Sequence, residues 1–202
     1  MILSTNILWI IYISLLIFNL FFINFFERKL RCPIKYQVFS VILGTVPLII
    51  NKELTLNAFV FTLLFEVLLI YAFIDIKFFE LSNWHYLITI FYALFGFGLS
   101  FFNHEYLLHL VSLFIMYITF FVFDKFVGIE KLGGADVKVM LSIALFFSAV
   151  DVLYFILMVF FISGIIFIIE RIVRKSFCDL QVPMIVSIAI AFYLTEFRYF
   201  FI

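Results

Sequence analysis

Long apolar segments alternate with short polar ones along the whole chain. The polar breaks divide it into about eight segments, near residues 2–26, 34–50, 56–75, 84–102, 106–126, 137–150, 152–170 and 183–202. Segments of about 20 apolar residues are long enough to cross the roughly 30 Å hydrocarbon core of a bilayer. The pattern therefore predicts an all-α, polytopic integral membrane protein with about eight transmembrane helices.

Two of these segments and one boundary are less clearly defined by the sequence than the others. The second and sixth segments are short, and the boundary between the sixth and seventh is placed at Asp151 only because it interrupts an apolar stretch. Pro183 suits the first turn of the last helix, where its missing N–H costs nothing. The first segment is too long for a signal-peptide core and lacks its basic flank, so we expect a retained span.

The basic residues indicate one orientation for these segments. With the N-terminus outside, eleven of the 13 lysines and arginines fall on the cytoplasmic side, and only Lys52 and Arg198 fall opposite. The eleven are Arg28, Lys29, Arg31, Lys35, Lys77, Lys125, Lys131, Lys138, Arg171, Arg174 and Lys175. Such a bias sets orientation by the positive-inside rule, and it supports an even number of spans.

Composition narrows the class of protein further. The chain is 67% hydrophobic and 13% charged, with a mean hydropathy of +1.30, which leaves too little charge for a water-facing shell. The short alternating segments of a membrane barrel are absent. The formal net charge is zero, so nothing favours nucleic acid as a partner. We expect a single membrane-embedded domain over residues 1–202.

Cysteine and histidine spacing does not indicate a metal site. Cys32 and Cys178 form no CxxC pair and no zinc-ligand spacing. His85, His104 and His109 have no partner at helical ligand spacing. We therefore expect neither a metal site nor a disulfide framework.

Two aspartates are the candidate chemical groups. Asp75 closes the third segment and Asp136 opens the sixth, so both fall at the cytoplasmic side of the predicted membrane. Two carboxylates that meet can share one proton and activate a water, as in aspartic proteases. Asp136 could instead be a first-turn acid that complements the helix dipole, and spacing alone leaves both interpretations open. Gly133 and Gly134 before it allow a tight turn or a close approach of a substrate strand.

The residues around both aspartates resemble those of a known family. Gly-Gly-Ala-Asp-Val-Lys at 133–138 is similar to the GxGD-type motif of prepilin peptidases, the type IV leader peptidases, in its GGAD variant. Asp75-Ile-Lys-Phe-Phe-Glu-Leu-Ser-Asn83 resembles the family's other aspartate, with its following basic residue and an Ile-Pro-Asn-like turn. Leu81 and Ser82 replace the usual isoleucine and proline of that turn.

Weaker likeness extends over most of the chain. Residues 18–28 resemble the family's first span, the segment from Lys35 resembles the start of its second, and Val182-Pro183 resembles the start of its last. One region departs from the pattern: the first cytoplasmic loop, about 27–34, holds Cys32 alone and is too short for the zinc and methyltransferase module of many bacterial members. We therefore expect cleavage without N-methylation.

The resemblance implies a specific activity. Members cleave the leader of type IV prepilins and pseudopilins at the cytoplasmic membrane face, just after a glycine. Residue by residue, Asp75 and Asp136 match the catalytic pair, which needs no cofactor. The expected partners are prepilin or pseudopilin precursors, and the expected location is the inner (cytoplasmic) membrane with the active site facing the cytoplasm.

Several neighbouring residues have supporting roles to be tested. Lys77 and Lys138 each follow an aspartate by two positions and point away from it on a helix, so we favour interfacial anchors over acids. For Asn83 we favour a cap of the next helix over a contact to substrate. Glu66, inside the third segment, could couple to the site or face a helix partner, and we favour the partner.

A different class of function competes with peptidase activity. Asp75, Asp136 and Glu66 could form a proton or cation relay in a transporter or channel. Such relays usually place acids near the bilayer midplane, with broken helices or internal repeats. Here the aspartates lie at segment ends and no repeat is visible, so we favour the peptidase. An inactive assembly protein of the same fold is a third possibility, which the intact aspartates count against.

Overall fold

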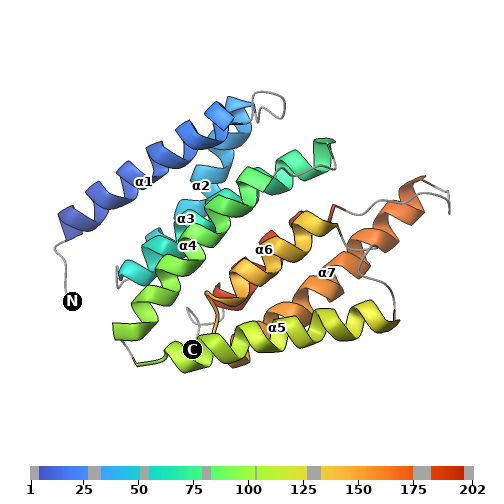
Figure 1. Cartoon of the computed structure of the whole chain (residues 1–202). Helices are drawn as coiled ribbons and strands as arrows, with labels where there is room; N and C mark the ends of the chain where they lie inside the picture. The colour runs from blue at the N-terminus through green and yellow to red at the C-terminus, as the bar shows by residue number, and fades with distance from the viewer. Residues whose placement is uncertain are drawn as a thin grey trace.

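The structure, a computed structural model, describes residues 5–26, 33–50, 55–78, 83–102, 104–126, 133–174 and 183–197. The regular elements in these ranges are eight helices (Figure 1). In chain order they are α1 (Thr5–Phe26), α2 (Ile34–Ile50), α3 (Leu56–Phe78), α4 (Asn83–Phe102), α5 (Tyr106–Phe126), α6 (Gly134–Ala144), α7 (Ala149–Arg174) and α8 (Met184–Phe197). The all-α prediction is confirmed.

Three helices in the described ranges are long and apolar enough to cross a bilayer. They contain the stretches Leu56–Lys77, Tyr106–Phe126 and Ala149–Val173. Shorter apolar stretches occur at Trp9–Phe18, Ile34–Val46, Tyr86–Phe101 and Met184–Glu196. The chain is thus a helical protein of membrane-like composition, and eight full crossings stay a prediction.

Helix α3 is the central element of the bundle. It packs against α1, α2, α4 and α8, and 83% of its apolar stretch is buried by them. By contrast, only 17% of the corresponding stretch of α5 is buried, because α5 lies at the edge of the molecule. A helix that is covered on all sides has no face that contacts solvent, so it needs no polar face. This explains why α3 is apolar around its circumference.

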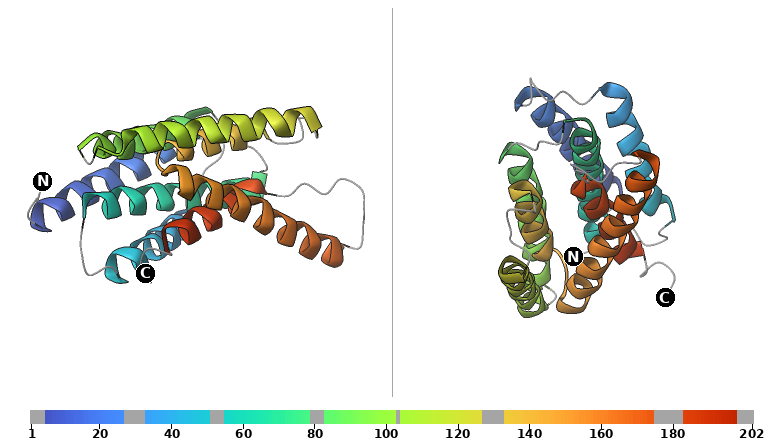
Figure 2. Two further views of the ribbon diagram at one scale, coloured as in Figure 1. Left: turned by 90° about the horizontal axis from the view of Figure 1, so that it is seen from below. Right: turned by 90° about the vertical axis from the view of Figure 1, so that its right-hand side faces the viewer.

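Helices α2 to α8 form two layers, which the end-on view of Figure 2 shows most clearly. Helices α4, α6 and α5 lie side by side in one layer, and α2, α3, α8 and α7 follow one another in the second. The layers meet where α3 packs on α4 and where α5 packs on α7. The short helix α6 also contacts α8, which brings the starts of α6 and α8 near the end of α3.

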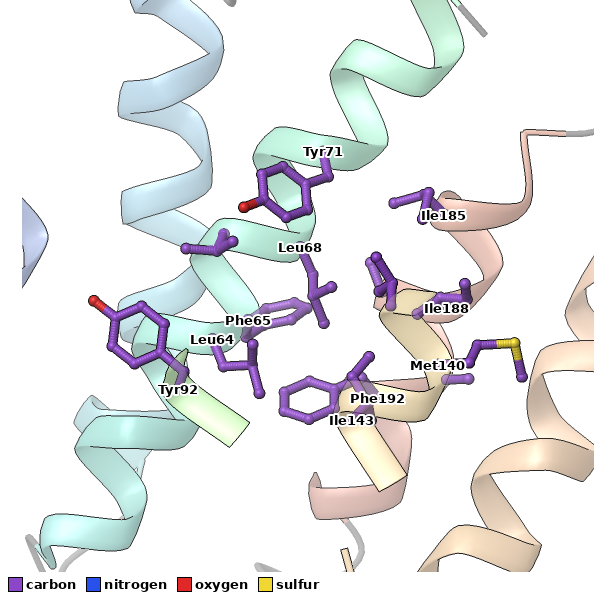
Figure 3. Packing of buried hydrophobic residues seen from close by; sticks show 14 of the residues in the cluster. Leu64, Phe65, Leu68, Tyr71, Tyr92, Met140, Ile143, Ile185, Ile188 and Phe192 are labelled. Carbon is purple, nitrogen blue, oxygen red and sulfur yellow. The ribbon is translucent and has the colours of Figure 1, made fainter. Parts of the chain in front are cut away.

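The side chains between the layers are large and apolar. Figure 3 shows Leu64 and Leu68 of α3 facing α6 and α8 across this core, while the ring of Tyr71 extends to the other side of α3. The side chains of Ile143, Ile185, Ile188 and Phe192 fill the space opposite, and Met140 packs on the far side of α6. Each is almost fully buried, so the relative positions of α3, α6 and α8 are fixed by close packing.

The boundary between the sixth and seventh helices differs from the prediction at Asp151. Helix α6 ends at Ala144, a turn follows, and α7 begins at Ala149, so Asp151 lies in the first turn of α7. The hydroxyl of Ser148 donates to Oδ2 of Asp151 over 2.5 Å, and the Asp151 N–H donates back over 3.5 Å. A serine followed three residues later by an acid is a helix-start signal, and it places the boundary at 145–148.

The C-terminal end of α6 lies against α5 rather than in water. The Ser112 hydroxyl donates to the Ala144 carbonyl, and Nδ1 of His109 lies 3.1 Å from the Leu145 carbonyl oxygen. The last carbonyls of a helix have no partner within it, and an unpaired one in an apolar region costs several kcal/mol. Ser112 and His109 therefore allow α6 to end inside the bundle.

Candidate active site

Asp75 lies in the last turn of α3, on the side of the helix that faces α8. Its side chain is buried, and Oδ2 accepts a 3.2 Å hydrogen bond from the backbone N–H of Ile185. Ile185 is the second residue of α8, where N–H groups have no partner within the helix. The carboxyl group of Asp75 thus links the end of α3 to the start of α8.

Asp136 is the third residue of α6 and turns back over the start of its own helix. It is half-buried, and its carboxylate accepts a hydrogen bond from the backbone of Gly133, the N-cap residue. An acid at this position that bonds the N-cap N–H forms half of a capping box. The first-turn interpretation of Asp136 is therefore correct, and it is compatible with a second role.

The two aspartates are electrostatic neighbours. The pKa of Asp136 is raised to about 7, mainly because burial disfavours the charged form and further because the charge of Asp75 acts on it. The hydrogen bond from Gly133 works in the opposite direction. Two neighbouring carboxyl groups that share one proton, because both cannot easily be charged at once, are the arrangement that aspartic proteases use.

Gly133 and Gly134 differ in their surroundings. A Cβ atom on Gly133 would lie 2.5 Å from Oδ2 of Asp136, whereas a Cβ on Gly134 would meet nothing within 4 Å. Both residues are exposed. Gly133 thus provides the space for the Asp136 carboxylate, and Gly134 borders open space at the start of the same helix.

The supporting residues predicted from the sequence lie around this end of the bundle. Lys77 is exposed in the last turn of α3, and Lys138 is exposed on α6 with Nζ 5.8 Å from the centre of the Tyr86 ring. Asn83 begins α4, and its side chain lies outside the described residues, so a cap there stays a prediction. The same holds for the first loop at 27–32, for Cys32 and for Cys178.

Glu66 is separate from the two aspartates. It lies about two and a half helical turns before Asp75 on α3, so the two side chains project from opposite faces. The Tyr12 hydroxyl of α1 donates to Glu66, while Asp75 faces α8. The favoured interpretation, that Glu66 faces a helix partner, is confirmed.

The backbone at the start of α8 is a part of the site that the sequence did not identify. The Ile185 N–H is a main-chain group, and the apolar Ile185 side chain gives no indication of it. Pro183, directly before α8, was the available signal, since proline commonly marks a helix start. Among the described residues no cluster of histidine, cysteine or acidic side chains could hold a metal ion.

Comparison with known proteins identifies one matching family. A model of the type IV leader peptidase family matches residues 60–168, slightly more than half of the chain. The match contains Asp75, the glycine pair and Asp136, and it ends within α7. No curated protein and no solved structure matches the chain. On the strength of the family match, this chain belongs to the type IV leader peptidase family.

Proposed function

We propose that the protein is an aspartic endopeptidase that removes the leader peptide of type IV prepilins or pseudopilins, cutting after a glycine. The observation that carries this proposal is the electrostatic interaction between two acids from separate helices, Asp75 and Asp136, at one end of the bundle. Both lie within the region that matches the peptidase family. The family supports leader peptidase activity in general, and the catalytic residues are our assignment.

The surroundings of each aspartate suggest its role. Asp136, whose pKa is raised to about 7, fits the protonated partner that donates a hydrogen bond to the scissile carbonyl oxygen. Oδ2 of Asp75 is occupied by the Ile185 N–H, which leaves Oδ1 to accept a proton from water. Asp75 is then the general base.

The cleavage step follows from these roles. The water oxygen attacks the carbonyl carbon while one of its protons passes to Asp75 and the proton of Asp136 passes to the carbonyl oxygen. As the tetrahedral intermediate collapses, the C–N bond breaks, the new amine takes the proton from Asp75, and the hydroxyl proton returns to Asp136. The pair is restored and no cofactor is required.

The open side of the site fits an extended peptide. Gly133 and Gly134 are exposed and no side chain covers Gly134, so a leader segment could lie across this turn beside Asp136. The first mature segment of the substrate, an apolar helix, would reach the site laterally from the bilayer. Lys77, Lys138 and Asn83 surround this approach and would interact with lipid headgroups or with the leader.

The location follows from the distribution of charge along the helices. The ends of α1, α3, α5 and α7 and the segments that follow them to the next helix starts hold eleven of the 13 lysines and arginines. By the positive-inside rule this end faces the cytoplasm. We therefore place the protein in the inner membrane, with Asp75 and Asp136 at the cytoplasmic face.

Co-expression with an epitope-tagged type IV prepilin tests the proposal. The wild type should shorten the precursor by the mass of its leader, cut after the glycine, and Asp75→Asn and Asp136→Asn should both leave it intact. Asp124→Asn is the matched control, because Asp124 is an exposed acid near the same end of the bundle. We expect this variant to cleave normally.

The same experiment can contradict each part of the proposal. Cleavage by either single variant would remove that aspartate from the catalytic pair. Failure of the folded wild type to cut several different prepilins would contradict the leader peptidase assignment itself.

A further inference from the structure

A second acid, Glu66, is buried in the middle of α3 and takes no part in the proposed chemistry. Only 1% of its surface is exposed. The Tyr12 hydroxyl of α1 donates to Oε1, while Oε2 is buried and has no hydrogen-bond partner among the described residues. An acid at this depth in an apolar bundle is costly, so its surroundings must fix its position closely.

Helix α2 contacts Glu66 from a second direction. A Cβ atom on Gly44 would overlap Cγ of Glu66, so the α2 backbone lies directly against this side chain. Ser40, one turn earlier on α2, is fully buried as well. Small residues four positions apart allow two helices in a membrane to approach closely. Glu66 is therefore held between α1 and α2.

The face of α3 that carries Glu66 is opposite to the face that carries Asp75. Tyr12 and Gly44 contact one side of the helix, and Ile185 contacts the other. A rotation of α3 by about 20° would move a side-chain tip at a radius of roughly 5 Å by between about 1 and 2 Å. A displacement of this size at a reacting group can cost on the order of 100-fold in rate.

We infer that Glu66, held by Tyr12 and Gly44, is a positioning residue that fixes the rotation of α3 and so directs Asp75 toward Asp136. The part of this inference that concerns the rate of cleavage rests on the proposed function, whereas the part that concerns the position of Asp75 does not. It assigns Glu66 no contact with substrate. It requires hydrogen bonding at residue 66 but no negative charge there.

Four variants test this inference in purified enzyme with a prepilin substrate. Glu66→Leu should lower kcat by on the order of 100-fold with little change in KM, although it should fold well, because replacing a buried acid with an apolar residue is often neutral or stabilising. Gly44→Ala should lower kcat in the same way through its clash with Glu66. Glu66→Gln keeps a hydrogen-bonding group and should cleave at close to the wild-type rate.

The fourth variant, Thr62→Val, is the matched control. Thr62 lies one turn before Glu66, is fully buried, and bonds only the Ala58 carbonyl of its own helix at 2.9 Å. Its replacement by valine removes a buried hydroxyl from α3 without removing a hydrogen bond between the described helices, and it nearly keeps the side-chain shape. Thr62→Val should therefore keep the wild-type kcat.

A second measurement reports the rotation of α3 without any cleavage. In a chain with Cys32→Ser and Cys178→Ser, the pair Asp75→Cys/Asp136→Cys should be joined by a short bifunctional thiol reagent, because the side chains at the two positions lie close enough to interact electrostatically. Adding Glu66→Leu should slow this cross-linking strongly. Adding Thr62→Val should leave the rate of cross-linking unchanged.

Two results would overturn the inference: wild-type kcat and cross-linking in Glu66→Leu, or loss of kcat in Glu66→Gln equal to that in Glu66→Leu. Failure of the proposed function is separable from both. If the wild type cleaves no prepilin but Glu66→Leu still slows the cross-link, the positioning role is supported while the peptidase assignment is contradicted.

Discussion

The backbone N–H of Ile185 donates a hydrogen bond to Oδ2 of Asp75 and so joins the first turn of α8 to the last turn of α3. One carboxyl group thereby serves two purposes, since the same side chain neighbours Asp136. Its structural contribution and its proposed catalytic one can be separated, because asparagine still offers an oxygen acceptor while alanine does not.

We expect Asp75→Asn to abolish cleavage with little change in stability, whereas Asp75→Ala should abolish cleavage and also destabilise the protein. Loss of a hydrogen bond to a charged group typically costs about 1.5–3 kcal/mol. The melting temperatures of Asp75→Asn and Asp75→Ala in detergent measure this difference in stability, and Asp136→Asn serves as the reference. Equal melting temperatures for the alanine and asparagine variants would show that α8 does not depend on this bond.

The two glycines before Asp136 should respond differently to substitution. In Gly133→Ala the new methyl group would lie 2.5 Å from Oδ2 of Asp136, so the carboxylate must move, and we expect kcat to fall by on the order of 100-fold. In Gly134→Ala the methyl group meets no protein atom. Because we propose that the substrate passes over Gly134, this substitution should raise KM.

Steady-state kinetics of both alanine variants with one prepilin substrate measures this division. Gly134→Val extends the series, and its KM should exceed that of Gly134→Ala while kcat changes little. An unchanged kcat in Gly133→Ala would show that the position of the Asp136 carboxylate does not depend on this glycine.

Cleavage should depend on pH through Asp136. Burial and the charge of Asp75 raise the pKa of Asp136 to about 7, and the proposed mechanism needs this group protonated. As the pH rises through about 7, Asp136 loses its proton and kcat should fall; below that pH the proton is present and this group does not limit the rate. A pH–rate profile at saturating substrate measures the midpoint.

The charge of Asp75 is the second cause of this shift, so Asp75→Asn should lower the pKa of Asp136. That variant is expected to be inactive, and infrared difference spectroscopy of the protonated carboxyl group provides the measurement instead. A pKa of Asp136 that is equal in wild type and Asp75→Asn would contradict the neighbouring position of the two acids.

The helical bundle was largely predictable because its signals are local. Polar breaks between apolar segments placed α2 and α5 at the observed bounds, Ile34–Ile50 and Tyr106–Phe126. The prediction was wrong between α6 and α7, where Leu145, Phe146 and Phe147 continue the apolar pattern although the helix has ended. Apolar composition does not distinguish a turn buried in a bundle from a helix, and only the capping pair Ser148 and Asp151 marked the boundary.

Only those parts of the candidate site that are formed by distinctive side chains could be predicted from the sequence. Asp75, Asp136 and the glycine pair stand out in the sequence, since acids and glycines are few in this chain. The Ile185 N–H and the different surroundings of Gly133 and Gly134 depend on how α3, α6 and α8 pack. Packing between distant segments is set by many weak contacts, which no single residue reports.

The end of α6 offers a last prediction about the support of the site. Ser112 donates a hydrogen bond to the Ala144 carbonyl, and α6 carries Asp136 at its other end. In Ser112→Ala this carbonyl loses its donor in an apolar region, which should destabilise the protein by about 1–3 kcal/mol. Thermal unfolding measures the loss, and the rate of prepilin cleavage should fall with it as α6 shifts.

Thr119→Val is the control for this effect. Thr119 lies two turns further along α5 and bonds the Ile115 carbonyl of its own helix at 2.9 Å, so its replacement removes a hydroxyl but no contact between helices. We expect it to unfold near the wild-type temperature. If Ser112→Ala and Thr119→Val lose the same small amount of stability, then His109, with its own contact to the Leu145 carbonyl, is sufficient to hold the end of α6. The combined variant Ser112→Ala/His109→Leu should then show the full loss.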